Sequence, residues 1–289
     1  MMSALFKSAE SDGADIAMTK LALITGASAG IGREACALFA QKGYRVIALS
    51  RQPSGVESAA LEMALDLESF EQIEGLAGTL DTEIAGAERV ILVNNSGYGQ
   101  FGALRDLSES MWLKQFSTHV FGPIKLAAVC LRLCEQHGVP LRVIAVSSVL
   151  SIVPQQMKGA YCAAKSAMNA AHDSFWFDEQ GSKSLESVSL VLPGPVATRF
   201  REHALAALKP VITRASATHQ EKYEALESAL APGARMKPFT ASASDVAKKI
   251  VRAAEAARPK PRYLVTPQTY IAAFITRVMP HSLQRKIFR

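Results

Sequence analysis

Short apolar runs alternate along the chain with longer segments that have the length and composition of helices. The apolar runs are Leu21–Ile24, Val46–Leu49, Met63–Leu67, Val90–Val93, Leu141–Val146 and Val188–Leu192, and Tyr263–Val265 is a candidate for a last edge strand. The helix-length segments include Arg33–Lys42, Phe70–Leu80, Ser108–Cys134 and Tyr161–Gln180. Uninterrupted apolar runs are typical of strands that are buried on both faces. The alternation predicts right-handed βαβ units in one doubly wound α/β domain, with a parallel sheet of about seven strands and helices on both faces.

A long helix-rich segment, residues 193–243, follows the last clear strand and is punctuated by Pro210, Pro232 and Pro238. In an open α/β sheet, ligands bind beyond the carboxyl ends of the strands. Because residues 193–243 leave the sheet at that end, we predict that they form a helical substrate lid. The lid is expected to belong to a single domain that spans residues 18–268.

The two ends of the chain are expected to lie outside this domain. Residues 1–17 carry Glu10, Asp12 and Asp15 and lack the apolar run of a signal peptide, so we expect a disordered leader, with Met18 as a candidate start. Residues 269–289 form an amphipathic tail. Its apolar residues recur at helical spacing, at Tyr270, Ile271, Phe274, Ile275, Val278 and Met279. Packing on the domain is the default expectation for such a helix, and a dimer contact or a membrane surface are the alternatives.

Composition and cysteine usage indicate a cytoplasmic globular protein. The chain has 289 residues, of which 49% are apolar and 20% charged, and no apolar run approaches the ~18 residues that a membrane-spanning helix needs. The four cysteines do not have the paired spacing of a zinc site, although Cys130 and Cys134 lie one helical turn apart. We therefore expect reduced, packed thiols and no metal site.

Charge is distributed unevenly along the chain. From Arg199 onward there are 17 basic and 6 acidic residues, a net charge of +11, whereas the preceding part carries −5. A basic C-terminal part attracts an anionic substrate or a membrane surface, or is simply a solvated face. Basic and aromatic residues are not interleaved as in nucleic-acid-binding proteins, so no nucleic acid is expected as a partner.

The first apolar run ends in a glycine-rich turn. Thr25 is followed by Gly26, Gly30 and Gly32, and a helix-like segment begins directly afterwards. Glycines let the backbone turn sharply and approach a phosphate, and the free N–H groups at a helix start attract negative charge. An ordinary tight turn is the alternative, but the strand before and the helix after favour a phosphate cradle. Residues expected to contact a dinucleotide here also include Ser28 and Ile31.

The second run ends in Ser50 and Arg51, at the position where an acidic residue would bind the 2′-hydroxyl of NAD. Arg51 instead offers a planar donor group for a 2′-phosphate, so NADP(H) is expected in preference to NAD(H). Asp66, at the end of the third run, is a candidate acceptor for the adenine amino group. The small polar turn after the next run is expected to line the adenosine side of the cofactor, through Asn94, Ser96 and Gly97.

A third group of residues carries candidate acid–base chemistry. Ser148 ends the fifth run, and Tyr161 and Lys165 lie four residues apart at the start of a predicted helix, so they share one helix face. A phenol has a pKa of about 10, and a neighbouring ammonium together with an oxidised nicotinamide would lower the pKa of Tyr161. Ser148 could then hydrogen-bond the reacting oxygen of a substrate.

Taken together, these motifs resemble the short-chain dehydrogenase/reductase (SDR) family over residues 20–265, and within it the hydroxysteroid and retinol dehydrogenase-like branch. The resemblance implies a Rossmann-like fold in which the tyrosine is the general acid–base, the lysine holds the nicotinamide ribose and the serine orients the carbonyl. These roles fall on Tyr161, Lys165 and Ser148. The segment after the sixth run would contact the nicotinamide carboxamide, through Pro193, Gly194, Val196 and Thr198.

The sequence departs from the family at His119, where an asparagine that helps to relay protons is usual. We hypothesise that His119 serves the relay, because imidazole can both donate and accept; an impaired relay is the alternative. Ser96, where alanine is more frequent, should be tolerated.

The predicted function is NADP(H)-dependent hydride transfer to or from a carbonyl or alcohol of an apolar small molecule. The candidate pocket residues are Tyr98, Phe101, Val149, Val153, Met157 and Phe200. An NADP(H)-binding sensor with little turnover is the alternative, which the complete set of Ser148, Tyr161 and Lys165 disfavours. The resemblance also implies a homodimer or homotetramer, and the basic tail leaves a peripheral membrane contact open.

Overall fold

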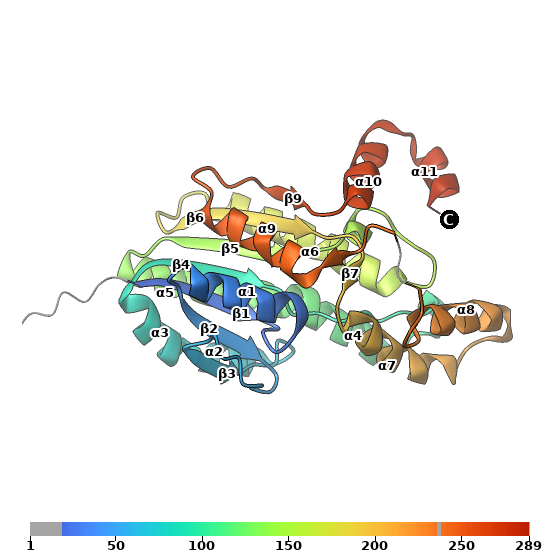
Figure 1. The fold of residues 1–289 in the computed structure, drawn as a ribbon, viewed down its shortest axis with the longest axis horizontal. Coiled ribbons are helices and arrows are strands. Elements are labelled where there is room, and N and C mark those ends of the chain that lie inside the picture. The colour runs from blue at the N-terminus through green and yellow to red at the C-terminus, as the bar shows by residue number, and fades with distance from the viewer. Residues whose placement is uncertain (1–18, 236–237, 289) are drawn as a thin grey trace, which may run out of the picture.

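Seven parallel strands form the central sheet in a computed structural model that describes residues 19–235 and 238–288 (Figure 1). The strand order is β3–β2–β1–β4–β5–β6–β9, so the chain winds outward from β1 in both directions, as predicted. The strands are β1 (Thr19–Thr25), β2 (Arg45–Ser50), β3 (Leu61–Ala64), β4 (Ala87–Asn94), β5 (Leu141–Val146), β6 (Leu185–Leu192) and β9 (Arg262–Leu264). β9 lies at the edge, where the weak run near Tyr263 is expected. The doubly wound α/β fold is confirmed.

Helices cover both faces of this sheet, because successive residues of each strand point to opposite faces. Leu21 and Leu23 pack in one core, and Ala22 and Ile24 pack in the other. The first core is closed by α2 (Phe70–Gly75), α3 (Ala77–Ala85), α5 (Gly122–His137) and α6 (Gly159–Asp178). The second core lies under α1 (Gly30–Gln41) and α9 (Ala243–Glu255), which run side by side (Figure 1).

Two predicted helices and one strand differ in detail from the structure. The segment predicted as one helix over 70–80 is divided at Leu76 into α2 and α3. The long helix predicted over 108–134 is α4 (Glu109–Phe116), a π-helical turn (Ser117–Phe121) and α5. β3 begins at Leu61, two residues before the predicted run that starts at Met63. Its pairing with β2 begins there, with Leu61 opposite Ile47. Asp66 therefore lies in the loop after β3.

The 193–243 excursion begins and ends in a second, two-stranded parallel sheet. Its strands are β7 (Val196–Ala197) and β8 (Ala241–Ser242), and its helices are α7 (Phe200–Ile212) and α8 (Gln220–Leu230). Figure 1 shows α7 and α8 projecting beyond the carboxyl ends of the central strands. Their apolar residues form a separate cluster that includes Phe101 and Tyr161. The predicted leader, residues 1–17, lies outside the described residues.

The C-terminal tail consists of α10 (Pro267–Val278) and α11 (His281–Ile287). Thr269 and Ala272 are buried, so α10 packs on the domain by one face. No helix within 19–235 or 238–288 combines the length and apolarity that a membrane crossing requires. The four cysteines are all free and buried, as expected, at Cys36, Cys130, Cys134 and Cys162.

Candidate active site

Two adjoining cavities lie at the carboxyl ends of the central strands. The larger has a volume of about 1060 Å³ and the smaller about 580 Å³. They share wall residues from three different segments of the chain: Ile31, Asn95, Gly97, Thr198 and Phe200. The larger cavity has mostly apolar walls, whereas polar and charged side chains make up much of the smaller one. This arrangement suits a ligand with a polar part and a substrate beside it.

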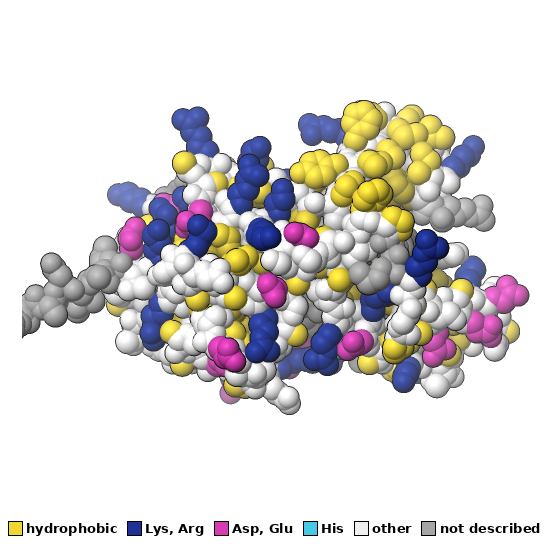
Figure 2. Space-filling model, viewed as in Figure 1, with side chains coloured by type: hydrophobic (Ala, Val, Ile, Leu, Met, Phe, Trp, Pro, Cys, Tyr) yellow, Lys and Arg dark blue, Asp and Glu magenta, His cyan; other side chains and the backbone are white. Residues whose placement is uncertain are grey.

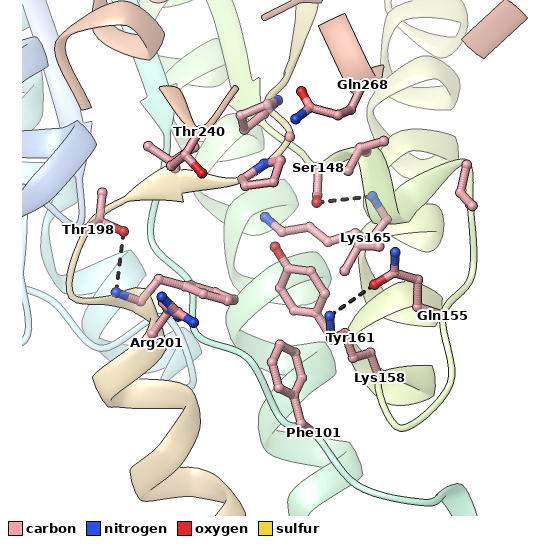
Figure 3. A pocket seen from close by; sticks show the side chains of 18 of the residues that line it. Phe101, Ser148, Gln155, Lys158, Tyr161, Lys165, Thr198, Arg201, Thr240 and Gln268 are labelled. Carbon is pink, nitrogen blue, oxygen red and sulfur yellow. Dashed lines mark hydrogen bonds between the residues drawn. The ribbon is translucent and has the colours of Figure 1, made fainter. Parts of the chain in front are cut away.

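Ser148, Tyr161 and Lys165 come together in the wall of the larger cavity (Figure 3). Ser148 follows β5, and Tyr161 and Lys165 lie one turn apart near the start of α6. Ser148 Oγ accepts a hydrogen bond from the Leu150 N–H at 3.1 Å. Lys165 Nζ donates to the Val146 carbonyl at 2.7 Å. The end of β5 thus holds both Ser148 and the amine of Lys165.

Burial dominates the electrostatics of these groups. Desolvation raises the pKa of Tyr161 above its ordinary value, and a hydrogen bond with Ser148 opposes this shift. Desolvation lowers the pKa of Lys165 to about 7. The protein's own groups therefore shift the pKa of Tyr161 upward, opposite to the direction expected beside an oxidised nicotinamide, because desolvation outweighs the hydrogen bond with Ser148. At neutral pH the phenol is protonated and can donate.

Aromatic rings fix the position of the Tyr161 side chain. Phe101, His119 and Phe200 all meet the ring of Tyr161 edge-on, with centroid distances of 6.0, 5.6 and 5.5 Å. Edge-to-face pairs at these distances stabilise each other beyond their buried area. The phenol is consequently held by packing on several sides while its hydroxyl borders the cavity (Figure 3).

His119 lies in the π-helical turn Ser117–Phe121, and its ring is buried against Tyr161. Its Nε2 is 2.8 Å from the Tyr98 carbonyl oxygen and 3.3 Å from the Tyr98 nitrogen. A carbonyl only accepts, so the shorter contact assigns the proton to Nε2. Nδ1 is then a buried acceptor with no hydrogen-bond partner among the described residues. Burial and the Lys165 charge lower the pKa of His119, which keeps the ring neutral.

The smaller cavity borders the glycine turn between β1 and α1. Gly26 and Gly30 have φ values of +66° and +54°, which side chains with a Cβ rarely adopt. A Cβ on Gly32 would lie 2.2 Å from the Gly26 carbonyl oxygen, so this position admits only glycine. The N-cap residue of α1, Ala29, offers no side-chain hydrogen bond to the first N–H groups. The first turn of α1 therefore borders the cavity without a side-chain cap on its N–H groups.

The other predicted cofactor residues line these cavities, except Gly32 and Asn94. Those lining the smaller cavity are Gly26, Ser28, Gly30, Ile31, Ser50, Arg51, Asp66, Ser96 and Gly97. Those lining the larger are Pro193, Gly194 and Val196, and Thr198 borders both. Gly32 lies directly beneath the turn, in contact with Gly26. Of the predicted substrate-pocket residues, Phe101, Val149, Val153 and Phe200 line the larger cavity, and Tyr98 lines the smaller. Met157 lines neither and packs against the cluster that includes Phe101 and Tyr161.

The structure places Asn94 in the interior and not at the cofactor edge. Its amide nitrogen is 3.1 Å from the Pro123 carbonyl and 3.3 Å from His172 Nε2. Asn94 is the last residue of β4, so its side chain follows the strand's alternation into the core beneath α5 and α6. It therefore supports the packing of these helices.

Asn95, the next residue, belongs to the turn predicted to line the cofactor but was not named among its contacting residues, and it borders both cavities. Its side-chain amide donates to the Thr25 carbonyl at 2.9 Å, and its backbone N–H donates to Thr25 Oγ1 at 2.9 Å. The Ser96 N–H also donates to Thr25 Oγ1, at 3.0 Å. These bonds join the ends of β1 and β4 and support the glycine turn. Strand alternation, applied from the buried Val93, could have identified Asn95.

The donor set fits a nicotinamide dinucleotide. Backbone N–H groups at the start of α1 suit a diphosphate, and Arg51 and Asp66 lie on the same cavity for the adenosine end. The lining then continues past Gly97 and Thr198 to Ser148 and the Tyr161 hydroxyl. The two cavities share wall residues, so a ligand held in the smaller one adjoins the larger.

Comparison with known proteins agrees with this geometry. A sequence model of the family described as short chain dehydrogenase matches residues 20–209. The "Uncharacterized oxidoreductase YbbO" of Escherichia coli is 31% identical over 278 residues, which cover 94% of this chain and 95% of that protein. The "Probable short-chain type dehydrogenase/reductase VdlC" of Helicobacter pylori is 27% identical and covers 93% and 96%. The named relatives are oxidoreductases, which does not favour a non-catalytic sensor.

Solved structures show the same fold. A short chain dehydrogenase/reductase from Burkholderia phymatum, in complex with NAD, superposes with a TM-score of 0.72 at 20% identity, over 93% of this chain and 95% of that chain. A short chain dehydrogenase from Burkholderia cenocepacia, in complex with NADP, gives a TM-score of 0.70 at 15% identity, over 94% and 98%. The chain belongs to the short-chain dehydrogenase family and is an oxidoreductase that acts on CH–OH groups with a nicotinamide cofactor.

Proposed function

We propose that the protein is an NADP(H)-dependent oxidoreductase that interconverts a carbonyl group and an alcohol in an apolar substrate, with Tyr161 as the general acid–base. One observation carries the proposal. The hydroxyl of Tyr161 and Ser148 border a large apolar cavity at the point where it joins the polar cavity of the glycine turn.

The roles of the two hydroxyls follow from their surroundings. Ser148 donates a hydrogen bond to the substrate oxygen and so fixes the carbonyl beside Tyr161. Tyr161 is protonated at neutral pH and gives its proton to that oxygen during reduction; the resulting phenolate takes the proton back from an alcohol during oxidation. The bound nicotinamide supplies or accepts the hydride.

Lys165 and His119 are proposed to return protons to Tyr161. The amine of Lys165 has a pKa of about 7, so it exchanges protons readily at neutral pH. His119 Nδ1 is a buried acceptor that can hold a hydrogen-bonded water in the larger cavity, whose wall includes the His119 ring. In this proposal, His119 performs the positioning that an asparagine performs elsewhere in the family.

NADP(H) is proposed in preference to NAD(H). Arg51 is exposed on the smaller cavity and has no ion pair within the part of the chain that the structure describes. Ser50 Oγ donates to the Gln52 carbonyl at 2.7 Å, which directs it toward the loop. A guanidinium that is not engaged by a carboxylate is available for a 2′-phosphate.

A homodimer or homotetramer is proposed, formed through the helices around α4, α5 and α6. These helices leave several large apolar side chains at the surface: Leu113, Phe121 and Phe177. Exposed apolar side chains on neighbouring helices are typical of subunit interfaces.

The test is NADPH oxidation, followed by absorbance, with a panel of aldehydes, aliphatic ketones, steroid ketones and retinal. Tyr161→Phe keeps the ring packing but removes the proton donor, so we expect turnover to fall at least ~100-fold, in the range that general acid catalysis contributes. NADPH binding, measured by fluorescence, should change little in this variant. The proposal is wrong if the native protein binds NADPH but Tyr161→Phe reduces every substrate equally well.

The cofactor preference is tested in the same assay with NADH. We expect a higher kcat/KM with NADPH, and Arg51→Ala should remove most of this preference. Equal use of both cofactors by the native protein would contradict the role of Arg51.

A further inference from the structure

The C-terminal helices present a continuous apolar surface to solvent. This tail patch consists of Tyr270, Ile271, Phe274 and Val278 on α10 and Leu283 and Ile287 on α11, which are between 43% and 67% exposed. The α10 members recur at helical spacing on the face opposite the buried Ala272. Figure 2 shows them as a yellow area over the end of the molecule where α10 and α11 lie. An apolar stripe on two successive helices is more than scattered surface residues.

Basic residues accompany the tail patch without any acidic ones. Residues 256–289 contain seven Lys or Arg and no Asp or Glu. Arg277 is exposed on α10, and Arg285 and Lys286 are exposed on α11. Figure 2 shows Lys and Arg side chains on both sides of the patch and no Asp or Glu within it on this face. This combination of apolar and cationic side chains is complementary to an anionic lipid surface.

The charge pattern disfavours a second copy of the chain as the occupant. In a symmetric dimer through this face, the cationic rims of the two tails would face each other. Like charges without acidic partners repel, and they do so more strongly as water leaves the interface.

The tail patch lies beside the larger cavity. Gln268, Ala272 and Phe288 come from α10 and the segment after α11, and all three line the same cavity as Tyr161 (Figure 3 labels Gln268). The inner face of α10 therefore borders the cavity while its outer face carries the patch. A molecule that enters past α10 reaches the cavity from the side of the patch.

We propose that the tail patch docks the protein on an anionic membrane surface, with the apolar side chains in the interfacial layer and the basic side chains on the lipid headgroups. The docked orientation sets the larger cavity beside the bilayer, so that an apolar substrate enters it from the lipid. This last step rests on the proposed function, whereas the docking itself does not.

The test is binding of the full chain to lipid vesicles, measured by flotation. Vesicles of phosphatidylcholine alone are compared with vesicles that contain about one third phosphatidylglycerol. We expect at least ~10-fold tighter binding to the anionic vesicles at low salt, because each surface basic residue contributes to the attraction. Binding should weaken as salt rises, since screening shortens the reach of the charges.

Matched variants connect the binding to the tail patch. Phe274→Ser, at a side chain that is 67% exposed, should weaken vesicle binding several-fold; Phe70→Ser, at 50% exposure on α2, should not. The double change Arg285→Glu and Lys286→Glu should abolish the preference for anionic vesicles. The same charge change at Lys248 and Lys249 on α9 is its control. NADPH binding by each variant shows that it is folded.

Three results would overturn the docking. They are absence of vesicle binding by the native chain, equal binding to both vesicle types, and unchanged binding of Phe274→Ser. If light scattering instead shows that Phe274→Ser separates an oligomer that binds no vesicles, the patch is a protein interface. Vesicle binding requires no turnover, so its failure is distinct from failure of the reductase assay.

Discussion

At the scale of single residues, His119 has the least usual surroundings in the candidate site. Its ring stands edge-on to Tyr161, its Nε2 is engaged by the Tyr98 carbonyl, and its Nδ1 has a lone pair without a partner in the described part of the chain. A buried acceptor without a partner costs about 1–3 kcal/mol, which a hydrogen-bonded water would recover. These contacts make the role of His119 testable.

His119→Phe removes the acceptor but keeps a ring against Tyr161, and we expect it to lower kcat at least ~10-fold with little change in KM. His119→Asn restores an amide acceptor and should keep turnover within about threefold of native. Steady-state kinetics with the best substrate of the panel measures both. A large rise in turnover for His119→Asn would show that His119 is not a competent substitute.

The sequence was sufficient to predict the relative positions of the site residues that depend on local spacing. Tyr161 and Lys165 share a face of α6 because they are four residues apart, and Ser148 is near them because parallel strands end at one edge of the sheet. Asn94 was misplaced because one residue decides whether a strand-end side chain points to the core or to the cavity. Burial, which reverses the pKa shift expected for Tyr161, depends on Phe101 and Phe200 from distant segments.

At the scale of elements, the turn between β1 and α1 depends on Gly32. A methyl group at this position would lie 2.2 Å from the Gly26 carbonyl oxygen and 2.7 Å from Asn95 Nδ2. We expect Gly32→Ala to weaken NADPH binding at least ~10-fold and to lower the free energy of unfolding by about 1–3 kcal/mol, as overpacking does. Calorimetric titration and urea denaturation measure the two effects.

Gly78→Ala is the matched control, because Gly78 lies within α3 and a Cβ there meets nothing within 4 Å. This variant should bind NADPH normally and gain about 0.5–1 kcal/mol of stability, since alanine favours the helix. If both variants bind NADPH equally well, the close contact at Gly32 does not control the cradle.

Element types were predictable, but the irregularity between α4 and α5 was not. The run of apolar residues over 108–134 gives no sign of the π-helical turn at Ser117–Phe121. The turn is followed by Gly122, which lies close to the loop after β3. A Cβ on Gly122 would lie 2.2 Å from the Leu67 carbonyl oxygen in that loop. Such a change of helical register is set by packing between distant segments, and not by periodicity.

At the scale of the whole molecule, a buried histidine makes stability depend on pH. His172 is held by the Met168 carbonyl and Asn94, and burial lowers its pKa from 6.5 to about 4. The unfolded chain therefore binds one proton more than the folded chain between these values. The stability contributed by neutral His172 is present above pH 6.5 and is lost as pH falls toward 4.

We expect His172→Gln to flatten the fall in the free energy of unfolding between pH 6.5 and 4, by roughly 3 kcal/mol over the window. Urea denaturation at several pH values measures this slope. His281→Gln, at an exposed position on α11, should leave the slope unchanged. A native slope no steeper than that of His172→Gln would contradict the buried neutral state.

The overall topology could be predicted from alternating strands and helices, because connection rules leave few arrangements of a parallel sheet. The packing of α7 and α8 against Phe101 and Tyr161 could not be predicted. The sequence pattern of residues 193–243 does not indicate which side chains of the rest of the domain they contact. The orientation of α10 could not be predicted either, because it depends on the burial of Ala272, which leaves the opposite face of the helix exposed.

The burial of every cysteine has a practical consequence for chemical labelling. Burial raises the pKa of Cys36 and Cys134 to about 12 and also raises those of Cys130 and Cys162, so almost no thiolate exists at neutral pH. Maleimides and similar reagents attack the thiolate. A single cysteine introduced at an exposed position would therefore be modified selectively in the otherwise native chain, and a dye attached there would report local polarity without removal of any natural thiol.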